Sequence, residues 1–254
     1  MAPDITSPGN DRIKWLVRLR ERRHRDTEGL FVVEGSRLYS RALQAGLSPV
    51  ITFLSEDVDA DTVGEVLSVD VAALDKASYR ERAEGLIAVF RQMDHSLSAF
   101  EVGNGPLLLV AENVEKPGNL GAMLRTVGAA GADALITVGD TVDAHNPNTI
   151  RASTGALFSV PLAMTEWDEL TPWLTVRGIR VIAATPSGGP SLWKTDLTGP
   201  IALVVGSEDR GLTESAVEAA EDIIRIPQAE GPVDSLNVSV SAAILVFEAA
   251  RQRG

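Results

Sequence analysis

The sequence predicts an α/β protein of two units, and three observations support that fold class. Short apolar runs alternate with segments of helical periodicity along most of the 254 residues. One run, Leu107–Ala111, contains only apolar residues, which is typical of a parallel strand covered on both faces. A polar, turn-rich stretch then suggests the division: residues 1–95 as a small domain, 96–105 as a linker and 106–254 as a second domain.

Composition places the chain among ordinary globular proteins. Hydrophobic residues make up 44% of it, and no apolar run approaches the ~20 residues that span a bilayer. The first ten residues hold no apolar signal segment, so we expect an untargeted cytoplasmic protein without a membrane partner. The chain has no cysteine, which excludes disulfides, thiolate zinc sites and a cysteine nucleophile, and we expect no metal site.

The first domain begins with a basic segment on an acidic chain whose net charge is −12. Residues Asn10–Arg25 have the periodicity of one amphipathic helix, and Glu21 is the only acid between its first and last basic residues. A solvated surface helix would explain such a charge run, but the excess of arginine favours contact with RNA or DNA. The candidate contacts are Arg12, Lys14, Arg18, Arg20, Arg22, Arg23 and Arg25.

The remaining elements of the first domain follow from alternating patterns. Strands are predicted at Leu30–Gly35, Val50–Leu54, Val69–Ala73 and Leu86–Arg91. Helices are predicted from Ser36, as a cap, to Gly46, and at Asp61–Leu67 and Asp75–Arg82.

The second domain shows the same alternation in longer form, which predicts a doubly wound parallel sheet with ligand sites at the carboxyl ends of its strands. After Leu107–Ala111, strands are predicted at Ala134–Val138, Ser159–Ala163, Ile179–Ala183, Ile201–Val205 and Ile223–Ile226. Helices are predicted at Leu120–Ala130, Asn148–Leu157, Trp167–Leu174, Glu214–Ala220 and Leu236–Arg251.

Three polar clusters follow predicted strands in this domain. The first runs from Glu112 to Thr126 and places Asn119 and Arg125 at a helix start, and the second runs from Val204 to Leu212 around Gly206-Ser-Glu-Asp-Arg-Gly211. The third, from Ile226 to Ser241, ends in a helix whose first turn offers unpaired N–H groups to a ligand or anion. Taken singly, Asn119 is explained as a helix cap and Glu208 as a loop brace or cap, whereas glycines beside them permit close approach of a ligand.

Together, the order and residue types of these clusters closely resemble the SpoU (TrmH-like) ribose 2′-O-methyltransferases of the SPOUT class. The resemblance covers Leu107–Arg253, and Phe31–Gly35 makes the first domain similar to a ribosomal-protein-L30e-like substrate-binding domain. It implies a deep trefoil knot in the second domain, S-adenosylmethionine as cofactor, and a homodimer through the C-terminal domain with the site at its interface. Nothing in the periodicity itself indicates a knot.

The resemblance also implies roles for individual residues. Arg125 would reach the acceptor ribose, and the residues that organise the catalytic site around it would be Asn119, Glu208, Ser235 and Asn237. The cofactor would be held by Ala184, Thr185, Gly206, Ile226, Pro227 and Leu236. Because a guanidinium stays charged, we expect Arg125 to stabilise the 2′-oxygen and pair with a phosphate rather than act as a general base.

The implied activity is 2′-O-methylation of a ribose in structured RNA. A separate basic domain favours 23S ribosomal RNA over tRNA, with Arg151 as a further phosphate contact. Housekeeping modification and protection against a ribosome-directed antibiotic fit the sequence equally. The alternatives are a tRNA methyltransferase, a non-catalytic RNA-binding protein of the same fold, and another nucleotide-using enzyme. This sequence lacks the dinucleotide-binding and P-loop patterns, which disfavours the last alternative.

Overall fold

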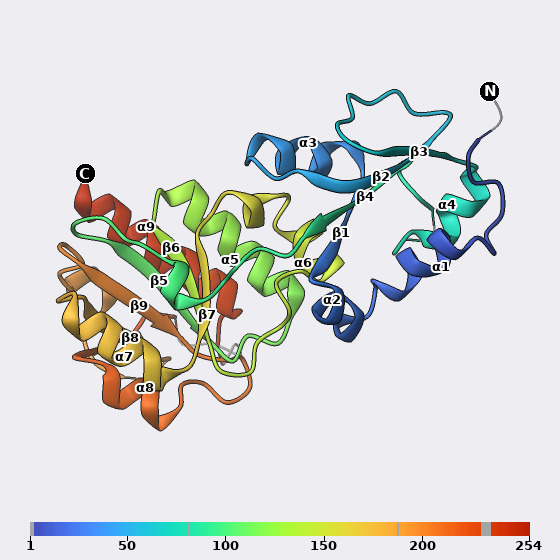
Figure 1. The fold of residues 1–254 in the computed structure, drawn as a ribbon. Coiled ribbons are helices and arrows are strands. Elements are labelled where there is room, and N and C mark those ends of the chain that lie inside the picture. The colour runs from blue at the N-terminus through green and yellow to red at the C-terminus, as the bar shows by residue number, and fades with distance from the viewer. Residues whose placement is uncertain (1–2, 81, 187, 230–234) are drawn as a thin grey trace. The chain divides into compact units, whose positions relative to one another are not determined.

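The computed structural model describes residues 3–80, 82–186, 188–229 and 235–254. Its contacts group the chain into two compact units, Met1–Met93 with Asp143–Phe158, and Asp94–Val142 with Ser159–Gly254 (Figure 1). The first junction lies close to the boundary expected near residue 95. The segment Asp143–Phe158, which we expected in the second domain, instead belongs to the first unit.

The first unit is built on a four-stranded sheet with strand order β1-β4-β2-β3. Strand β4 pairs antiparallel with both β1 and β2, whereas β3 pairs parallel with β2. The strands are β1 (Leu30–Glu34), β2 (Pro49–Ser55), β3 (Val66–Val69) and β4 (Leu86–Arg91). The helices are α1 (Asp11–Arg18), α2 (Arg22–Glu28), α3 (Ser36–Gln44), α4 (Val71–Ala77) and α6 (Pro147–Ala152), with the 3-10 turn η2 (Ala156–Phe158).

The basic segment forms two helices, so the prediction of one helix over Asn10–Arg25 was wrong. Helix α1 ends at Arg18, and Leu19 is fully buried in the core of the first unit. The Arg25 guanidinium donates to the carbonyl oxygens of Leu19 (2.8 Å) and Arg20 (2.6 Å), which satisfies the backbone where the chain turns. A tertiary contact therefore overrides continuous helical periodicity.

The predicted elements between residues 61 and 82 were also wrong. Strand β3 (Val66–Val69), in register with β2, begins inside the predicted helix Asp61–Leu67 and three residues before the predicted strand Val69–Ala73. Helix α4 (Val71–Ala77) begins four residues before the predicted helix Asp75–Arg82. Asp70 starts α4, because its carboxylate accepts the N–H of Ala72 at 2.9 Å. The N-cap of α3 also lies one residue before the predicted one. Gly35 is the N-cap, and Ser36, the predicted cap, is the first residue of the helix.

The second unit contains a six-stranded parallel sheet with strand order β10-β8-β9-β5-β6-β7, which confirms the predicted α/β class. The strands are β5 (Leu107–Glu112), β6 (Ala134–Val138), β7 (Leu162–Thr165), β8 (Arg180–Ala184), β9 (Ile201–Val205) and β10 (Asp222–Ile224). The helices are α5 (Pro117–Ala130), α7 (Trp167–Val176), α8 (Glu214–Ala219) and α9 (Val238–Arg253), with the turns η1 (Leu97–Ala99) and η3 (Leu192–Lys194).

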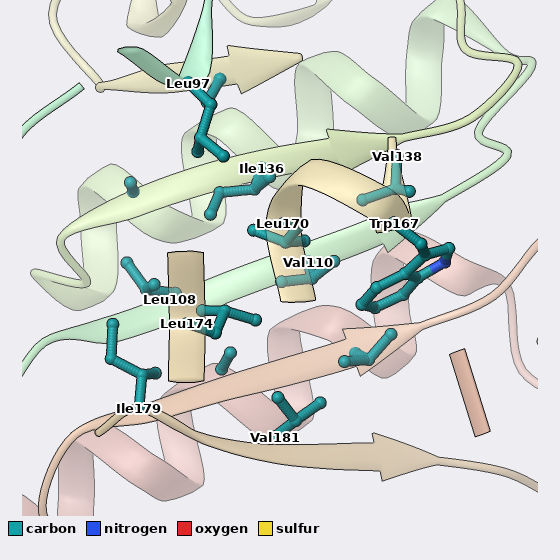
Figure 2. Packing of buried hydrophobic residues seen from close by; sticks show 14 of the residues in the cluster. Leu97, Leu108, Val110, Ile136, Val138, Trp167, Leu170, Leu174, Ile179 and Val181 are labelled. Atoms are coloured by element: carbon teal, nitrogen blue, oxygen red, sulfur yellow. The ribbon is translucent and has the colours of Figure 1, made fainter. Parts of the chain in front are cut away.

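Helices cover both faces of this sheet, with α5 and α9 packed together on one face and α7 and α8 on the other (Figure 1). Figure 2 shows the α7 face, where Leu170 and Leu174 point onto Leu108 and Val110 of the central strand. Each fully buried side chain of this kind contributes roughly 1.5–3 kcal/mol. The central strands are thus fixed rigidly, and their carboxyl ends meet along one edge.

The stretch predicted as a linker is part of the second unit. Leu97 and Phe100 are buried, 7% and 8% exposed, and pack in the cluster of Figure 2. The trefoil knot stays a prediction, because the path from β8 to α9 includes residues 187 and 230–234, which lie outside the described residues. Among the described residues, no helix combines the length and the apolar character needed to cross a bilayer.

Candidate active site

A cavity of about 340 Å³ opens at the carboxyl ends of β8 and β9 in the second unit. That volume falls in the usual range for small-molecule sites. Five of the six residues predicted to hold a cofactor are in its lining, namely Ala184, Thr185, Gly206, Ile226 and Leu236. The sixth, Pro227, is exposed and is not among the described lining residues.

The wall contributed by β9 is a tight loop. The N–H of Ser207 donates to the carbonyl of Gly211 at 3.1 Å, and the N–H of Gly211 donates back to Ser207 at 3.0 Å. A Cβ on Gly206 would lie 2.3 Å from the carbonyl carbon and oxygen of Gly211. Only glycine fits at position 206, which explains the first glycine of the predicted cluster.

The opposite wall is fixed by the residue that follows β8. The N–H of Thr185 donates to the carbonyl of Ile224 at 2.9 Å, and its hydroxyl accepts the N–H of Gly188 at 2.9 Å. Gly189 has φ +68°, and a Cβ there would lie 1.6 Å from the carbonyl oxygen of Ile223. Backbone contacts hold this wall in place, so its backbone groups are positioned in advance of any ligand.

Glu112 begins the first predicted cluster, but the sequence patterns assigned it no role. Its carboxylate is 1% exposed at the end of β5. It accepts hydrogen bonds from Trp167 Nε1 (2.6 Å), Thr213 Oγ1 (2.5 Å) and Thr213 N (2.9 Å). Because Thr213 ends the loop that begins at Gly206, Glu112 anchors the cofactor wall to the central strand. The only sequence signal was an acid at the end of an apolar run.

A second hollow of about 120 Å³ adjoins the first, and both are lined by Glu208. The Glu208 carboxylate accepts hydrogen bonds from Lys116 Nζ, Asn119 Nδ2 (3.1 Å) and Asn237 Nδ2. The structure therefore brings together three of the predicted catalytic residues, Asn119, Glu208 and Asn237. It adds Lys116, which the sequence interpretation had not used.

The hydrogen bonds of this cluster fix its charges. The bond from Lys116, followed by that from Asn119, holds the pKa of Glu208 below its usual value. The same contact with Glu208 raises the pKa of Lys116. Both groups are therefore ionised at neutral pH, and the cluster presents a carboxylate, an ammonium group and two amides held together by hydrogen bonds.

Asn237 connects this cluster to the start of α9. Its Oδ1 accepts the N–H of Ser239 at 2.9 Å as the helix N-cap, while its Nδ2 donates to Asn119 Oδ1 at 3.2 Å. Ser235 and Ser241 line the first cavity beside it. The predicted helix mouth is thus one wall of that cavity, although the predicted stretch also includes residues 230–234, which lie outside the described residues.

Arg125 is not in the cluster. It is exposed on α5, six positions after Asn119, and six residues rotate a helix by about 240°, so the two side chains leave different faces. Within the part of the chain that the structure describes, Arg125 makes no hydrogen bond or ion pair and lines neither hollow.

The basic residues of the first unit divide into two groups. Arg25 is 1% exposed and pairs with Asp143, so its prediction as an RNA contact is corrected to a structural role. Arg20 is half-buried and donates to the carbonyls of Lys76, Ala77 and Ser78, which makes it a brace as well. The exposed candidates are Arg12, Lys14, Arg18, Arg22, Arg23 and Arg151.

Comparison with known proteins agrees with this arrangement. The profile of the SpoU rRNA Methylase family matches residues 106–247, and that of the MRM3-like substrate binding domain matches residues 10–88. The 23S rRNA (guanosine-2′-O-)-methyltransferase RlmB of Ralstonia nicotianae is 37% identical over 178 residues, which cover 68% of this chain and 71% of that protein. The 23S rRNA (guanosine(2553)-2′-O)-methyltransferase RlmP of Bacillus subtilis is 28% identical over 249 residues, covering 96% of this chain and 97% of its own.

A crystal structure gives the same result in three dimensions. The AdoMet-bound rRNA methyltransferase from Sinorhizobium meliloti superposes with a TM-score of 0.89 at 30% identity, over 97% of each chain. The sequence motifs, the parallel sheet and the family match therefore agree, and the chain belongs to the SpoU rRNA methylase family.

Proposed function

We propose that this protein transfers the methyl group of S-adenosylmethionine to a ribose 2′-oxygen of 23S ribosomal RNA. Membership of the SpoU family supports methyl transfer, and the names of the Ralstonia and Bacillus relatives support this RNA. The observation that carries the proposal is the cavity of about 340 Å³, whose walls contain five predicted cofactor residues and which shares Glu208 with the adjoining cluster. A substrate in ribosomal RNA would be modified in the cytoplasm.

The residues of the cavity suit the proposed cofactor, which is bound in the Sinorhizobium methyltransferase structure. Side chains of Leu212, Ile226 and Leu236 offer an apolar slot for an adenine ring, and Thr185 with the 206–211 loop offers polar and backbone groups at its edges. When bound, S-adenosylmethionine supplies an electrophilic methyl group. The protein would have to hold that group in line with the ribose 2′-oxygen, whose proton would be released to solvent as the new C–O bond forms.

Arg125 is proposed to act electrostatically on the acceptor. A guanidinium has a pKa above about 12, so it remains charged and cannot accept the ribose proton at neutral pH. It can stabilise negative charge on the 2′-oxygen and pair with a neighbouring phosphate. Its exposure on α5, without a partner among the described residues, leaves its donors available for RNA.

The cluster around Glu208 is proposed to organise the acceptor side. Lys116 and two amides converge on one carboxylate, so the shape of the hollow is set before RNA binds. The polar groups that line this hollow include Asn113 and Arg210, which are suited to contacts with ribose hydroxyls and a phosphate.

We also propose a homodimer through the second unit. Val240 and Phe247 are 46% and 49% exposed on α9. They lie seven positions apart, on one face of the helix, where large apolar side chains are usually covered. A second copy of this chain would bury them, as the family resemblance implies.

The activity is tested with purified protein, radiolabelled S-adenosylmethionine and unmodified transcripts of 23S rRNA and tRNA, followed by mapping of the methylated nucleotide. We expect transfer to 23S rRNA. Transfer only to tRNA would replace the proposed substrate, and RNA binding without transfer or cofactor affinity would favour a non-catalytic protein.

The division of labour is tested with Arg125→Ala. Transfer should be abolished while calorimetric affinity for S-adenosylmethionine stays within about twofold of wild type. Arg177→Ala is the matched control, because Arg177 is also exposed on the second unit but stacks on Trp173. Loss of cofactor affinity in Arg125→Ala would contradict a role confined to the acceptor.

A further inference from the structure

The first unit carries a shallow hollow, and Arg151, a predicted RNA contact, is the one residue of its described lining that has been given a role above. Its lining comes from β1, α3, the loop after α4, and α6, and consists of Val32, Glu34, Leu38, Tyr79, Arg80, Pro147, Ile150 and Arg151. Val32 and Ile150 are buried and form an apolar floor, 7% and 1% exposed. Tyr79, by contrast, is 39% exposed at the rim.

The backbone beside Tyr79 is held from two directions. Glu34 accepts the N–H of Tyr79 at 2.5 Å and the hydroxyl of Ser78 at 3.0 Å. Arg20 donates to the carbonyls of Lys76 (2.6 Å) and Ser78. A loop braced in this way presents its side chain in a fixed position, and such preorganisation lowers the entropy cost of binding.

The Tyr79 ring is also linked to a cation. Asn148 Nδ2 donates to the Tyr79 hydroxyl at 3.2 Å, and Arg151 Nη2 donates to Asn148 Oδ1 at 2.8 Å. Arg80 is paired with Glu84, but among the described residues no carboxylate pairs with Arg151. The rim therefore combines an exposed ring with an unneutralised guanidinium.

An exposed aromatic ring on a braced loop, beside a guanidinium that no described carboxylate neutralises, matches the chemistry of an unstacked nucleotide. Proteins read single-stranded RNA by stacking bases on aromatic rings, and arginine contacts the adjacent phosphate. An RNA nucleotide uses both groups at once, because its base stacks on the ring and its phosphate pairs with the guanidinium. The exposed face of Tyr79 and the positive charge of Arg151 thus both favour RNA as the occupant.

We propose that the rim of this hollow binds one unstacked nucleotide of the substrate RNA, with the base lying on the exposed ring of Tyr79 and a flanking phosphate on Arg151. The hollow beneath the rim, about 20 Å³, is too small to enclose a base. The proposal rests on the proposed RNA methyltransferase function and names where, apart from the reacting ribose, the RNA is held. It adds Tyr79 to the proposed RNA contacts and assigns Arg151 to the phosphate that flanks the stacked base.

The test measures the affinity of the full-length protein for transcribed 23S rRNA, and separately KM and kcat for methyl transfer. Tyr79→Ala should weaken RNA binding and raise KM for RNA roughly 5- to 150-fold, the range for loss of one stacked base. Tyr79→Phe keeps the ring and should stay near wild type. Arg151→Gln should weaken binding and reduce its salt dependence by about one counterion. In all three variants kcat at saturating RNA and affinity for S-adenosylmethionine should be unchanged.

Arg91→Gln is the matched charge control. Arg91 is exposed at the other end of the β1–β4 pair, opposite Leu30, whereas Glu34 lies at the end beside the hollow. RNA affinity of Tyr79→Ala equal to wild type, or an equal loss in Arg91→Gln and Arg151→Gln, would overturn the proposal. RNA affinity is measured independently of methyl transfer. A wild-type protein that binds RNA but methylates none would therefore refute the proposed function, whereas the effect of Tyr79→Ala on RNA affinity would still test nucleotide binding at the hollow.

Discussion

Replacing Glu112 by Gln removes one charge and one acceptor from the buried end of β5. Three donors converge on the carboxylate, at 2.6, 2.5 and 2.9 Å. The single amide oxygen of Gln can face either the Trp167 and Thr213 side chains or the Thr213 N–H. In each orientation at least one buried donor faces the NH₂ group and loses its acceptor.

The expected cost follows from those contacts. One unsatisfied buried donor costs about 1–3 kcal/mol, and the remaining bonds lose their charge assistance, so Glu112→Gln should destabilise by about 2–4 kcal/mol. Removing a buried charge has an opposing benefit, because the carboxylate has no cation partner among its described contacts. We expect the hydrogen bonds to dominate, since both carboxylate oxygens are used.

Urea unfolding at neutral pH measures the difference in free energy of unfolding between Glu112→Gln and wild type. Calorimetry measures the affinity for S-adenosylmethionine, which should fall because the 206–213 loop loses its anchor. Glu115→Gln is the control, because Glu115 is exposed in the same loop region and should change stability by less than about 0.5 kcal/mol. A Glu112→Gln protein at least as stable as wild type, with unchanged affinity for S-adenosylmethionine, would show that the relief of desolvation offsets the lost hydrogen bonds, and would refute the anchoring role.

Three further outcomes are expected. Gly206→Ala should lower the calorimetric affinity for S-adenosylmethionine roughly 10-fold or more, because its Cβ would meet backbone at 2.3 Å, whereas Gly118→Ala, with nothing within 4 Å, should not; equal affinities would argue against the tight loop. The pKa of Glu248 is lowered to about 2 from 4.5 by its arginine and glutamine partners, so its stabilising contribution is present above pH 4.5 and lost as pH falls towards about 2. Glu248→Gln should therefore cost about 1–2 kcal/mol in urea unfolding at neutral pH and almost nothing near pH 2, and a pH-independent cost would contradict the ion pair. Arg25→Met should destabilise by about 3–5 kcal/mol on thermal or urea unfolding, whereas the exposed Arg22→Met should leave stability unchanged and weaken RNA binding; the reverse pattern would mean that their burial is misassigned.

The four inner strands of the central sheet, β5, β6, β8 and β9, could be predicted to within one residue, whereas β7 at the sheet edge begins three residues later than predicted. Ala134–Val138 and Ile201–Val205 coincide with β6 and β9, because strands buried on both faces are continuous apolar runs bounded by polar turns. The first unit was harder to predict, since its strands are short and half-buried. Burial along β3 is intermediate at three of four positions, and there the pairing with β2 decides the structure rather than any local pattern.

The candidate site also has parts that could be predicted from the sequence and parts that could not. The cofactor loops could be located because glycines and short polar residues follow strands, and the family motifs identified them. The partners of those loops could not, because Glu112 meets Thr213 across 101 positions and Lys116 meets Glu208 across 92. Arg25 was misplaced for the same reason, since its partner Asp143 lies 118 positions away.

The Arg25–Asp143 contact affects how a substrate-binding unit can be transferred from one family member to another. Because the Asp143–Phe158 segment belongs to the first unit, the chain passes between the units at three junctions rather than at one linker. A chimera cut only near residue 95 would combine Arg25 of one parent with the segment of the other, and would also divide the Tyr79 and Arg151 hollow between two parents. Recombination that transfers RNA specificity intact has to move two separate pieces of sequence together.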